Sequence, residues 1–262
     1  MGDLLENENF TFTYRRIPKR LPHLPSGGDP ADLEAYQFQT TWNRHQTAVL
    51  VVDMWDQHWC RGATERVKGL AIRMEKVLSQ ARNVGIQIIH CPSETMQFYK
   101  DYSQRARILK TVENHSRKQD PWIRLRWWEW PFPIDDRDGG CFCTPRCTEG
   151  MPWSRQIATI QIQDPDVISD DGWEIETFCH LKGITNLIYM GVHTNMCVLG
   201  RSFGIRHMVK AGFQVMLCRD LTDTMYNPAR RPYVSHEDGT ERVVRHIERY
   251  WCPSLLSEDL MI

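Results

Sequence analysis

The sequence has no long hydrophobic run. Its 262 residues are 41% hydrophobic, but the longest apolar stretches, residues 47–53 and 184–192, are each about one strand long. A helix needs about 20 consecutive apolar residues to cross a bilayer. The first nine residues are acidic and polar, and they lack the basic flank and apolar stretch of a secretory signal. The sequence therefore predicts a cytoplasmic protein that makes no membrane contact.

An excess of one charge is also lacking, because 32 Lys and Arg residues nearly balance 33 Asp and Glu residues. A protein that binds nucleic acid by charge normally has a basic surface, so we expect no nucleic-acid partner. Nine cysteines in a chain of this size are too sparse and irregular for a small disulfide scaffold. The length fits one large α/β domain, or two small domains, with a sizeable core.

Residues 1–43 differ from the rest of the chain. Their prolines and the Ser26-Gly27-Gly28 run exclude a long helix. They also contain several aromatic side chains, too many for a disordered tail: Phe10, Phe12, Tyr14, Tyr36, Phe38 and Trp42. We expect an N-terminal arm that packs on the main domain, residues 44–262, or on a partner subunit in a homo-oligomer.

From Thr47 onward, the sequence alternates between strand-like and helix-like patterns. Residues 48–52 form a continuous, mostly β-branched apolar run, which is typical of a strand covered on both faces. Residues 64–83 have helical apolar spacing and end before Gly85, and residues 86–89 predict the next strand. Such a unit should place its two strands parallel in one sheet.

The second half repeats this order. We expect a helix near residues 104–115, strands at 157–160, 167–168, 186–192 and 214–218, and helices at 173–182, 197–211 and 240–250. An irregular insertion at about 121–156 holds five of the ten tryptophans: Trp122, Trp127, Trp128, Trp130 and Trp153. Strands and helices in this order predict a doubly wound α/β sheet.

Reactive side chains follow three of the predicted strands. Ligands bind at the carboxyl ends of strands in such sheets. Asp53 and His90 each follow a strand candidate, and Cys197 follows the candidate at 186–192, within the turn Gly-Val-His-Thr-Asn-Met-Cys. A cysteine that opens a helix has its thiolate stabilised by the helix dipole and the unpaired amides there. The alternative for Cys197 is a small core residue.

Two segments resemble a known family. Residues 47–54 (TAVLVVDM) resemble the first-strand motif of the isochorismatase-like cysteine hydrolases, and residues 191–198 (GVHTNMCV) resemble their nucleophile turn. The resemblance covers residues 47–92 and 166–226, and leaves the arm, the insertion and the C-terminal tail outside. It implies a Rossmann-like three-layer α/β/α fold with a mostly parallel central sheet. It also implies a hydrolase of amides, ureides or related C–N bonds with a Cys, Asp and Lys triad.

The resemblance also assigns roles. It implies that Cys197 is the nucleophile, that Asp53 is its general base, and that the backbone N–H groups of Met196 and Cys197 form the oxyanion hole. It further implies a cis peptide bond between Val192 and His193. We expect substrate contacts from His193 and Asn195, which flank the nucleophile, and from Trp55 and His90 near the strand ends.

The triad lysine has no counterpart in this sequence. The matching position is Asp164, or Ser169 or Asp170 if a loop is shorter, and Lys182 lies at the wrong end of its helix. Three alternatives stay open. Another cation such as Arg155 or Lys100 enters the site, the helix start alone stabilises the thiolate, or the chain is a non-catalytic binding or scaffold protein.

Two residue groups raise the question of a metal. Asp56, His58 and His90 could hold a divalent ion, as in metal-assisted, nicotinamidase-like amidohydrolases, or could be polar residues at the pocket mouth. Three cysteines of the insertion have spacing near that of a zinc knuckle, which leaves zinc, a disulfide or a turn-rich loop as readings: Cys141, Cys143 and Cys147. We expect a small-molecule substrate and no cofactor or catalytic metal, with a divalent metal such as zinc as the alternative.

Overall fold

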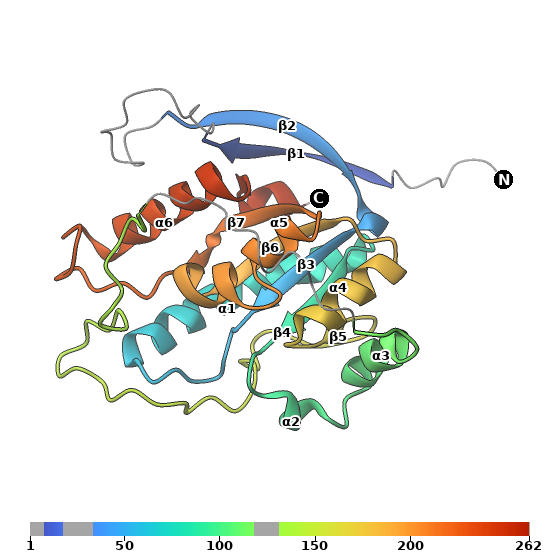
Figure 1. Ribbon diagram of the computed structural model, residues 1–262, viewed down its shortest axis with the longest axis horizontal. Coiled ribbons are helices and arrows are strands. Elements are labelled where there is room, and N and C mark those ends of the chain that lie inside the picture. The colour runs from blue at the N-terminus through green and yellow to red at the C-terminus, as the bar shows by residue number, and fades with distance from the viewer. Residues whose placement is uncertain (1–7, 18–33, 118–130, 262) are drawn as a thin grey trace.

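The computed structural model describes residues 8–17, 34–117 and 131–261. Within them, eight strands form one sheet in the order β2-β1-β8-β7-β6-β3-β4-β5 (Figure 1). The strands from β8 to β5 run parallel, whereas β1 is antiparallel to both of its neighbours. Their bounds are β1 Asn9–Arg16, β2 Tyr36–Asn43, β3 Thr47–Val52, β4 Gln87–Cys91, β5 Val167–Ile168, β6 Asn186–Val192, β7 Gln214–Asp223 and β8 Ser254–Leu255.

Helices cover both faces of this sheet (Figure 1). Their bounds are α1 Arg61–Asn83, α2 Met96–Tyr99, α3 Ser103–Val112, α4 Gly172–Leu181, α5 Ile205–Lys210 and α6 His236–Tyr250. Short 3-10 turns lie at Arg44–Gln46 and Ser257–Leu260. None of the helices in the described ranges is long and apolar enough to cross a membrane.

The alternation of side chains along β3 divides the core into two layers. Ala48, Leu50 and Val52 pack in one cluster with apolar residues of α3, α4, α5 and α6. Val49 and Val51 pack in the other cluster, against α1. All six residues of β3 are buried, because successive strand side chains point to opposite faces and both faces are covered. The predicted three-layer α/β/α fold with a mostly parallel sheet is confirmed.

The described part of the N-terminal arm is a hairpin that extends the sheet. β1 and β2 pair antiparallel from Asn9↔Asn43 to Arg16↔Tyr36, and β1 meets β8 at Arg15↔Ser254. The hairpin thus packs on its own chain, one of the two placements expected. The proline-rich residues 18–33 lie outside the described ranges.

Two expected elements are wrong. Residues 157–160 form no strand, and only Gln156 makes an isolated bridge, to Trp55. The expected helix over residues 197–211 is broken: a π-helical turn spans Thr194–Val198, and α5 begins only at Ile205. Gly204 starts α5 in an extended conformation, so the chain changes direction soon after Cys197.

The insertion has little regular structure where it is described. Residues 131–156 run as an extended chain along the left and lower margin of the molecule (Figure 1). Trp153 stacks on Trp55 with ring centroids 4.4 Å apart. The other four tryptophans of the insertion, at positions 122, 127, 128 and 130, lie outside the described ranges.

Candidate active site

Asp53 and Cys197 meet at the carboxyl edge of the sheet because β3 and β6 are parallel neighbours. Val52, the last residue of β3, pairs with Gly191. The chain turns sharply at both strand ends: Asp53 has a φ of 47° and Gly191 a φ of 119°. A Cβ added at Gly191 would lie 2.0 Å from the Val52 carbonyl oxygen, so only glycine allows this approach.

The Asp53 carboxyl group is completely buried. Its Oδ1 accepts a hydrogen bond from the Ser93 amide at 2.7 Å, and it also contacts the Cys197 thiol. Burial raises the pKa of Asp53 to about 6, although the contacts with Cys197 and Ser93 and the nearby Arg201 charge all act to lower it. A carboxyl group with this pKa can accept and return a proton near neutral pH.

Cys197 is half-buried and lies within the π-helical turn rather than at the first residue of a helix. Burial raises the pKa of its thiol above the usual value; the Asp53 charge raises it further, and Arg201 acts in the opposite direction. The resting pair is therefore a thiol beside a carboxylate. The expectation that the helix start holds Cys197 as a thiolate does not match this geometry.

Arg201 is the cation that the sequence reasoning missed. Its Nε lies 3.6 Å from Asp53 Oδ2, and it contacts Cys197. It also pairs with Glu94, NH1 to Oε1 at 3.3 Å. Arg201 follows Cys197 by four residues, which is one helical turn, and this spacing is the signal that could have found it.

The two cations that the sequence suggested for the site, Arg155 and Lys100, do not take the position beside Asp53 that Arg201 takes. Arg155 and Lys100 are exposed, and the Arg155 guanidinium lies over the Phe98 ring. At the positions that match the family lysine, Asp164 accepts from Arg107 and Asp170 accepts from the Glu94 amide at 2.8 Å.

The expected oxyanion hole is partly occupied. The Met196 amide donates to the His193 carbonyl oxygen at 2.9 Å. In this arrangement the N–H group of Met196 is not free to bind an oxyanion, which corrects one half of the expected pair.

His193 follows the cis peptide bond from Val192, which the resemblance implied. It is buried, and its Nε2 has no hydrogen-bond partner among the described residues. Burial lowers the pKa of His193 to about 3, so the ring is neutral. The His193 and His58 rings form a T-shaped pair, with centroids 4.9 Å apart. A buried nitrogen without a partner can accept or donate a hydrogen bond to a ligand.

Asn195 and Trp55 use their polar atoms within the protein. Asn195 Nδ2 donates to Asp136 Oδ2 at 2.8 Å, and its Oδ1 accepts from the Met225 amide at 3.0 Å. Trp55 Nε1 donates to the Ser93 carbonyl at 3.1 Å. These hydrogen bonds occupy the polar atoms of both side chains, and the expected substrate contacts of Asn195 and Trp55 stay a prediction.

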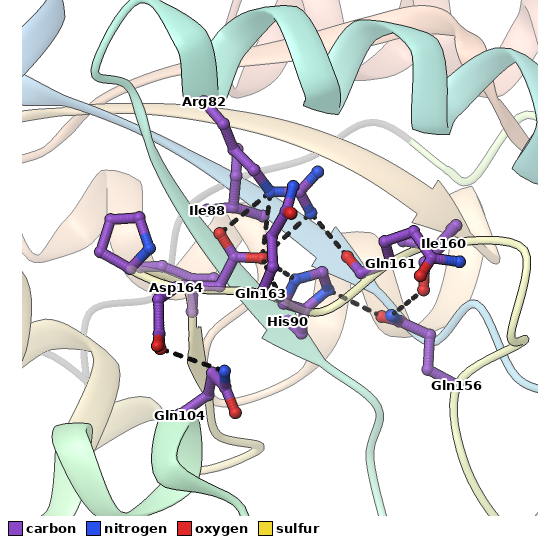
Figure 2. Close-up of polar contacts among 12 residues, drawn as sticks. Arg82, Ile88, His90, Gln104, Gln156, Ile160, Gln161, Gln163 and Asp164 are labelled. Atoms are coloured by element: carbon purple, nitrogen blue, oxygen red, sulfur yellow. Dashed lines mark hydrogen bonds and ion pairs between the residues drawn. The ribbon is translucent and has the colours of Figure 1, made fainter.

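His90 lies outside the site. It is fully buried, and both ring nitrogens are occupied: Nε2 by Asp166 at 2.9 Å and Nδ1 by Gln156 at 3.0 Å. Asp166 also pairs with Arg82, NH2 to Oδ2 at 3.0 Å. Figure 2 shows this network between α1, β4 and the chain before β5. It fixes His90 as a structural residue, contrary to the expected substrate contact.

The expected Asp56, His58 and His90 metal group is not assembled. Asp56 accepts from the Ser154 amide and hydroxyl at 3.0 and 2.6 Å, and the His58 Nδ1 accepts from the Cys60 amide at 3.1 Å. Within the described ranges, the residues with metal-ligand geometry are instead four cysteines: Cys60, Cys141, Cys143 and Cys147.

A cavity of about 780 Å³ lies beside this region. His58 and Trp59 line it, whereas Cys197 and Asp53 are not among its lining residues. His58 lines this cavity, and its ring also contacts the His193 ring. His58 therefore lies between the cavity and the residues around Cys197.

Comparisons with known proteins support the fold. Neither the protein-family models nor the curated proteins that were searched contain a match to this sequence. Among solved structures, the chain resembles a cysteine hydrolase from Pseudomonas syringae, with a TM-score of 0.54 and 18% identity over 84% of this chain and 92% of that one. It also resembles an isochorismatase family protein from Desulfovibrio vulgaris, with a TM-score of 0.50 and 12% identity over 82% and 96% of the two chains. The chain therefore has the isochorismatase-like fold.

Proposed function

We propose that this protein is a cysteine-dependent hydrolase of a small amide-type substrate. The observation that carries the proposal is the contact of the Cys197 thiol with the buried carboxyl group of Asp53, beside Arg201. Such a thiol and base within reach of each other form an activated nucleophile. The similarity in fold to a cysteine hydrolase and an isochorismatase family protein supports the hydrolase class.

The first half of the reaction is acylation. The Cys197 sulfur attacks the carbonyl carbon while Asp53 takes the thiol proton, and the tetrahedral intermediate forms. Asp53 then gives this proton to the leaving nitrogen, the C–N bond breaks, and an amine and a thioester remain. Because the resting nucleophile is a thiol, proton transfer accompanies the attack rather than preceding it.

The second half is hydrolysis of the thioester. Asp53, again a carboxylate, takes a proton from water as the water oxygen attacks the carbonyl carbon. The C–S bond breaks, the acid is released, and the proton held by Asp53 returns to the sulfur. In this scheme Arg201 balances the negative charge that moves between Asp53 and Cys197.

Two further groups serve the substrate. The Cys197 amide is the donor left from the expected oxyanion hole, because the Met196 amide is already bonded to His193. The neutral His193 ring offers its Nε2 as a polar contact. The cavity lined by His58 and Trp59 has room for the part of the substrate that does not react.

The test is hydrolysis by the purified protein of a panel of small amides, ureides and carbamates, measured as release of amine or ammonia. Cys197→Ala and Cys197→Ser should abolish turnover, and the wild-type protein should accumulate an acyl group that peptide mapping locates on Cys197. The matched control is Cys218→Ala, which removes a thiol from the opposite core layer and should retain turnover.

Retained hydrolysis in the Cys197 variants would rule out this nucleophile. An acyl group on a different residue would do the same. If the wild-type protein binds panel compounds without forming any covalent adduct, the scaffold alternative replaces the enzyme.

A further inference from the structure

Four cysteines from two distant parts of the chain converge at the start of α1. Cys60 precedes this helix, whereas the other three belong to the insertion: Cys141, Cys143 and Cys147. Their sulfur atoms all lie within 4.8 Å of one another. The sequence showed only the three insertion cysteines as a group, and the fold supplies the fourth.

The spacing of the sulfur atoms fits one tetrahedral metal ion. With Zn–S bonds of about 2.3 Å, two ligand sulfurs of a tetrahedral site lie about 3.8 Å apart. The Cys60 and Cys143 sulfurs are 3.7 Å apart. A disulfide requires about 2.05 Å, and all four residues are free thiols.

Backbone amides point at the sulfur atoms. The Gly62 amide donates to Cys143 Sγ at 3.3 Å, and the Arg61 amide donates to Cys147 Sγ at 3.4 Å. Both amides belong to the first turn of the 23-residue helix α1, where N–H groups have no partner within the helix. Such amides and the helix dipole stabilise thiolates rather than thiols.

One cation lies close to the cluster, Arg66, whose Nε pairs with Asp223 at 2.8 Å. Arg66 NH1 and Cys143 Sγ both lie against Gly62, since a Cβ added there would be 3.2 and 3.3 Å from them. A divalent cation would remove the mutual repulsion of four neighbouring thiolates.

We propose that Cys60, Cys141, Cys143 and Cys147 bind one structural zinc ion. Zinc suits the site because thiolates are soft ligands and four of them close the tetrahedron, leaving no position for water or substrate. Each thiol releases its proton to solvent as its sulfur binds the metal. The ion would fasten the insertion to the start of α1.

This site lies apart from the proposed nucleophile but supports its surroundings. The anchored segment contains Asp136, which bonds Asn195, and Gly140, which packs directly on the Met225 backbone. Arg61 and Thr148, next to two of the cysteines, line the 780 Å³ cavity. The metal would therefore hold one wall of the cavity without touching Cys197.

The experiment uses the reduced full-length chain stripped of metal and titrated with Co²⁺, then with Zn²⁺. We expect one Co²⁺ per chain with the strong thiolate-to-cobalt absorption of a tetrahedral tetrathiolate, displaced by one equivalent of Zn²⁺. Zn²⁺ should also raise the Tm of the apo protein, because the assembled site binds the ion more tightly than the cysteines of the unfolded chain do.

Variants locate the site. Cys143→Ser should abolish the tetrathiolate absorption, and because Cys143 is half-exposed this variant should stay folded by circular dichroism even if Cys60→Ser does not. Cys197→Ala and Cys218→Ala should bind Co²⁺ as the wild-type chain does. This pattern separates the zinc site from the proposed nucleophile, since it does not depend on turnover.

Absence of thiolate-to-cobalt absorption in the reduced wild-type chain would overturn the proposal. Unchanged absorption in folded Cys143→Ser would do so as well. An intact mass lower by two hydrogens, with mapping of a Cys60–Cys143 disulfide in protein isolated under thiol-blocking conditions, would assign the cluster to a disulfide instead.

Discussion

At the scale of single residues, Asp53 carries the largest electrostatic cost in the candidate site. Its carboxyl group is buried, and Arg201 approaches it only to 3.6 Å. Burial therefore outweighs the favourable contacts and raises its pKa to about 6. The same burial keeps Cys197 as a thiol, so the pair stores one proton that the proposed chemistry moves back and forth.

Asp53→Asn should abolish turnover and at the same time stabilise the folded protein at pH 8. The pKa of Asp53 rises from 3.8 to about 6 on folding, so the folded state binds the proton more tightly. Stability from this group is present below pH 4 and is lost as the pH rises through 6, a difference of about 3 kcal/mol. The free energy of urea unfolding should favour the variant at pH 8, and the gap should shrink at pH 5. A variant less stable than wild type at pH 8 would contradict this.

The cationic role of Arg201 predicts a shift in the pH profile. Arg201→Met should lower kcat/KM by about 100-fold and move its acid limb to higher pH, because the Arg201 charge lowers the pKa of Asp53. Arg201→Lys should restore part of the rate and the wild-type acid limb. A rate loss with no shift of the acid limb would assign Arg201 a packing role alone.

At the scale of elements, the ends of β3 and β6 place the two reactive groups. The approach of Gly191 to the Val52 carbonyl leaves no room for a side chain. Cys197 lies within the π-helical turn Thr194–Val198. The Arg201 amide donates to the Cys197 carbonyl oxygen at 3.1 Å, and this helical bond holds Arg201 one turn further on, where it reaches the Asp53 carboxyl group.

Gly191→Ala should destabilise the protein by more than about 3 kcal/mol, because it combines a steric clash with a φ of 119° that side chains disfavour. The control is Gly69→Ala in α1, where an added Cβ meets nothing within 4 Å and alanine is the better helix former. Chemical unfolding of both variants gives the comparison. Equal stabilities would show that the close strand contact is not needed.

At the scale of the whole molecule, the N-terminal hairpin joins the C-terminal region. Arg15 of β1 donates from Nε to Glu248 of α6 at 2.7 Å and from NH2 to Glu241 at 2.8 Å. The Glu248 side chain is fully buried, and burial raises its pKa while Arg15 opposes the increase. The ion pair between Arg15 and Glu248 thus joins β1 to α6.

Arg15→Met should destabilise the protein by about 3 kcal/mol at pH 7, because it leaves the buried Glu248 carboxylate without its cation. The loss should be smaller at pH 5, since the already raised pKa of Glu248 rises further in the variant and the neutral acid forms more easily. Arg16→Met, at an exposed neighbouring position, is the control. Urea unfolding at both pH values measures the difference, and a loss independent of pH would contradict it.

The sequence by itself determined the layers of the fold and the two central residues. Runs such as residues 48–52 specify a strand buried on both faces, because burial and periodicity are local properties of the chain. The family resemblance then pointed to Asp53, which directly follows β3, and to Cys197, five residues after the end of β6, and the carboxyl ends of these two strands share one edge of the sheet.

Only the tertiary structure decided the partners of the polar side chains. The sequence predicted substrate contacts for His90 and Asn195. In the structure their side chains form hydrogen bonds with Asp166 and Asp136, which are far away in the sequence. Arg201 reaches Asp53 because the parallel pairing of β3 and β6 brings the turn after β6 to the end of β3. Cys60 joins the insertion cysteines only because the chain returns to the start of α1. A hydrogen bond or ion pair depends on distances of a few ångströms between separate elements, and strand order and loop paths set those distances.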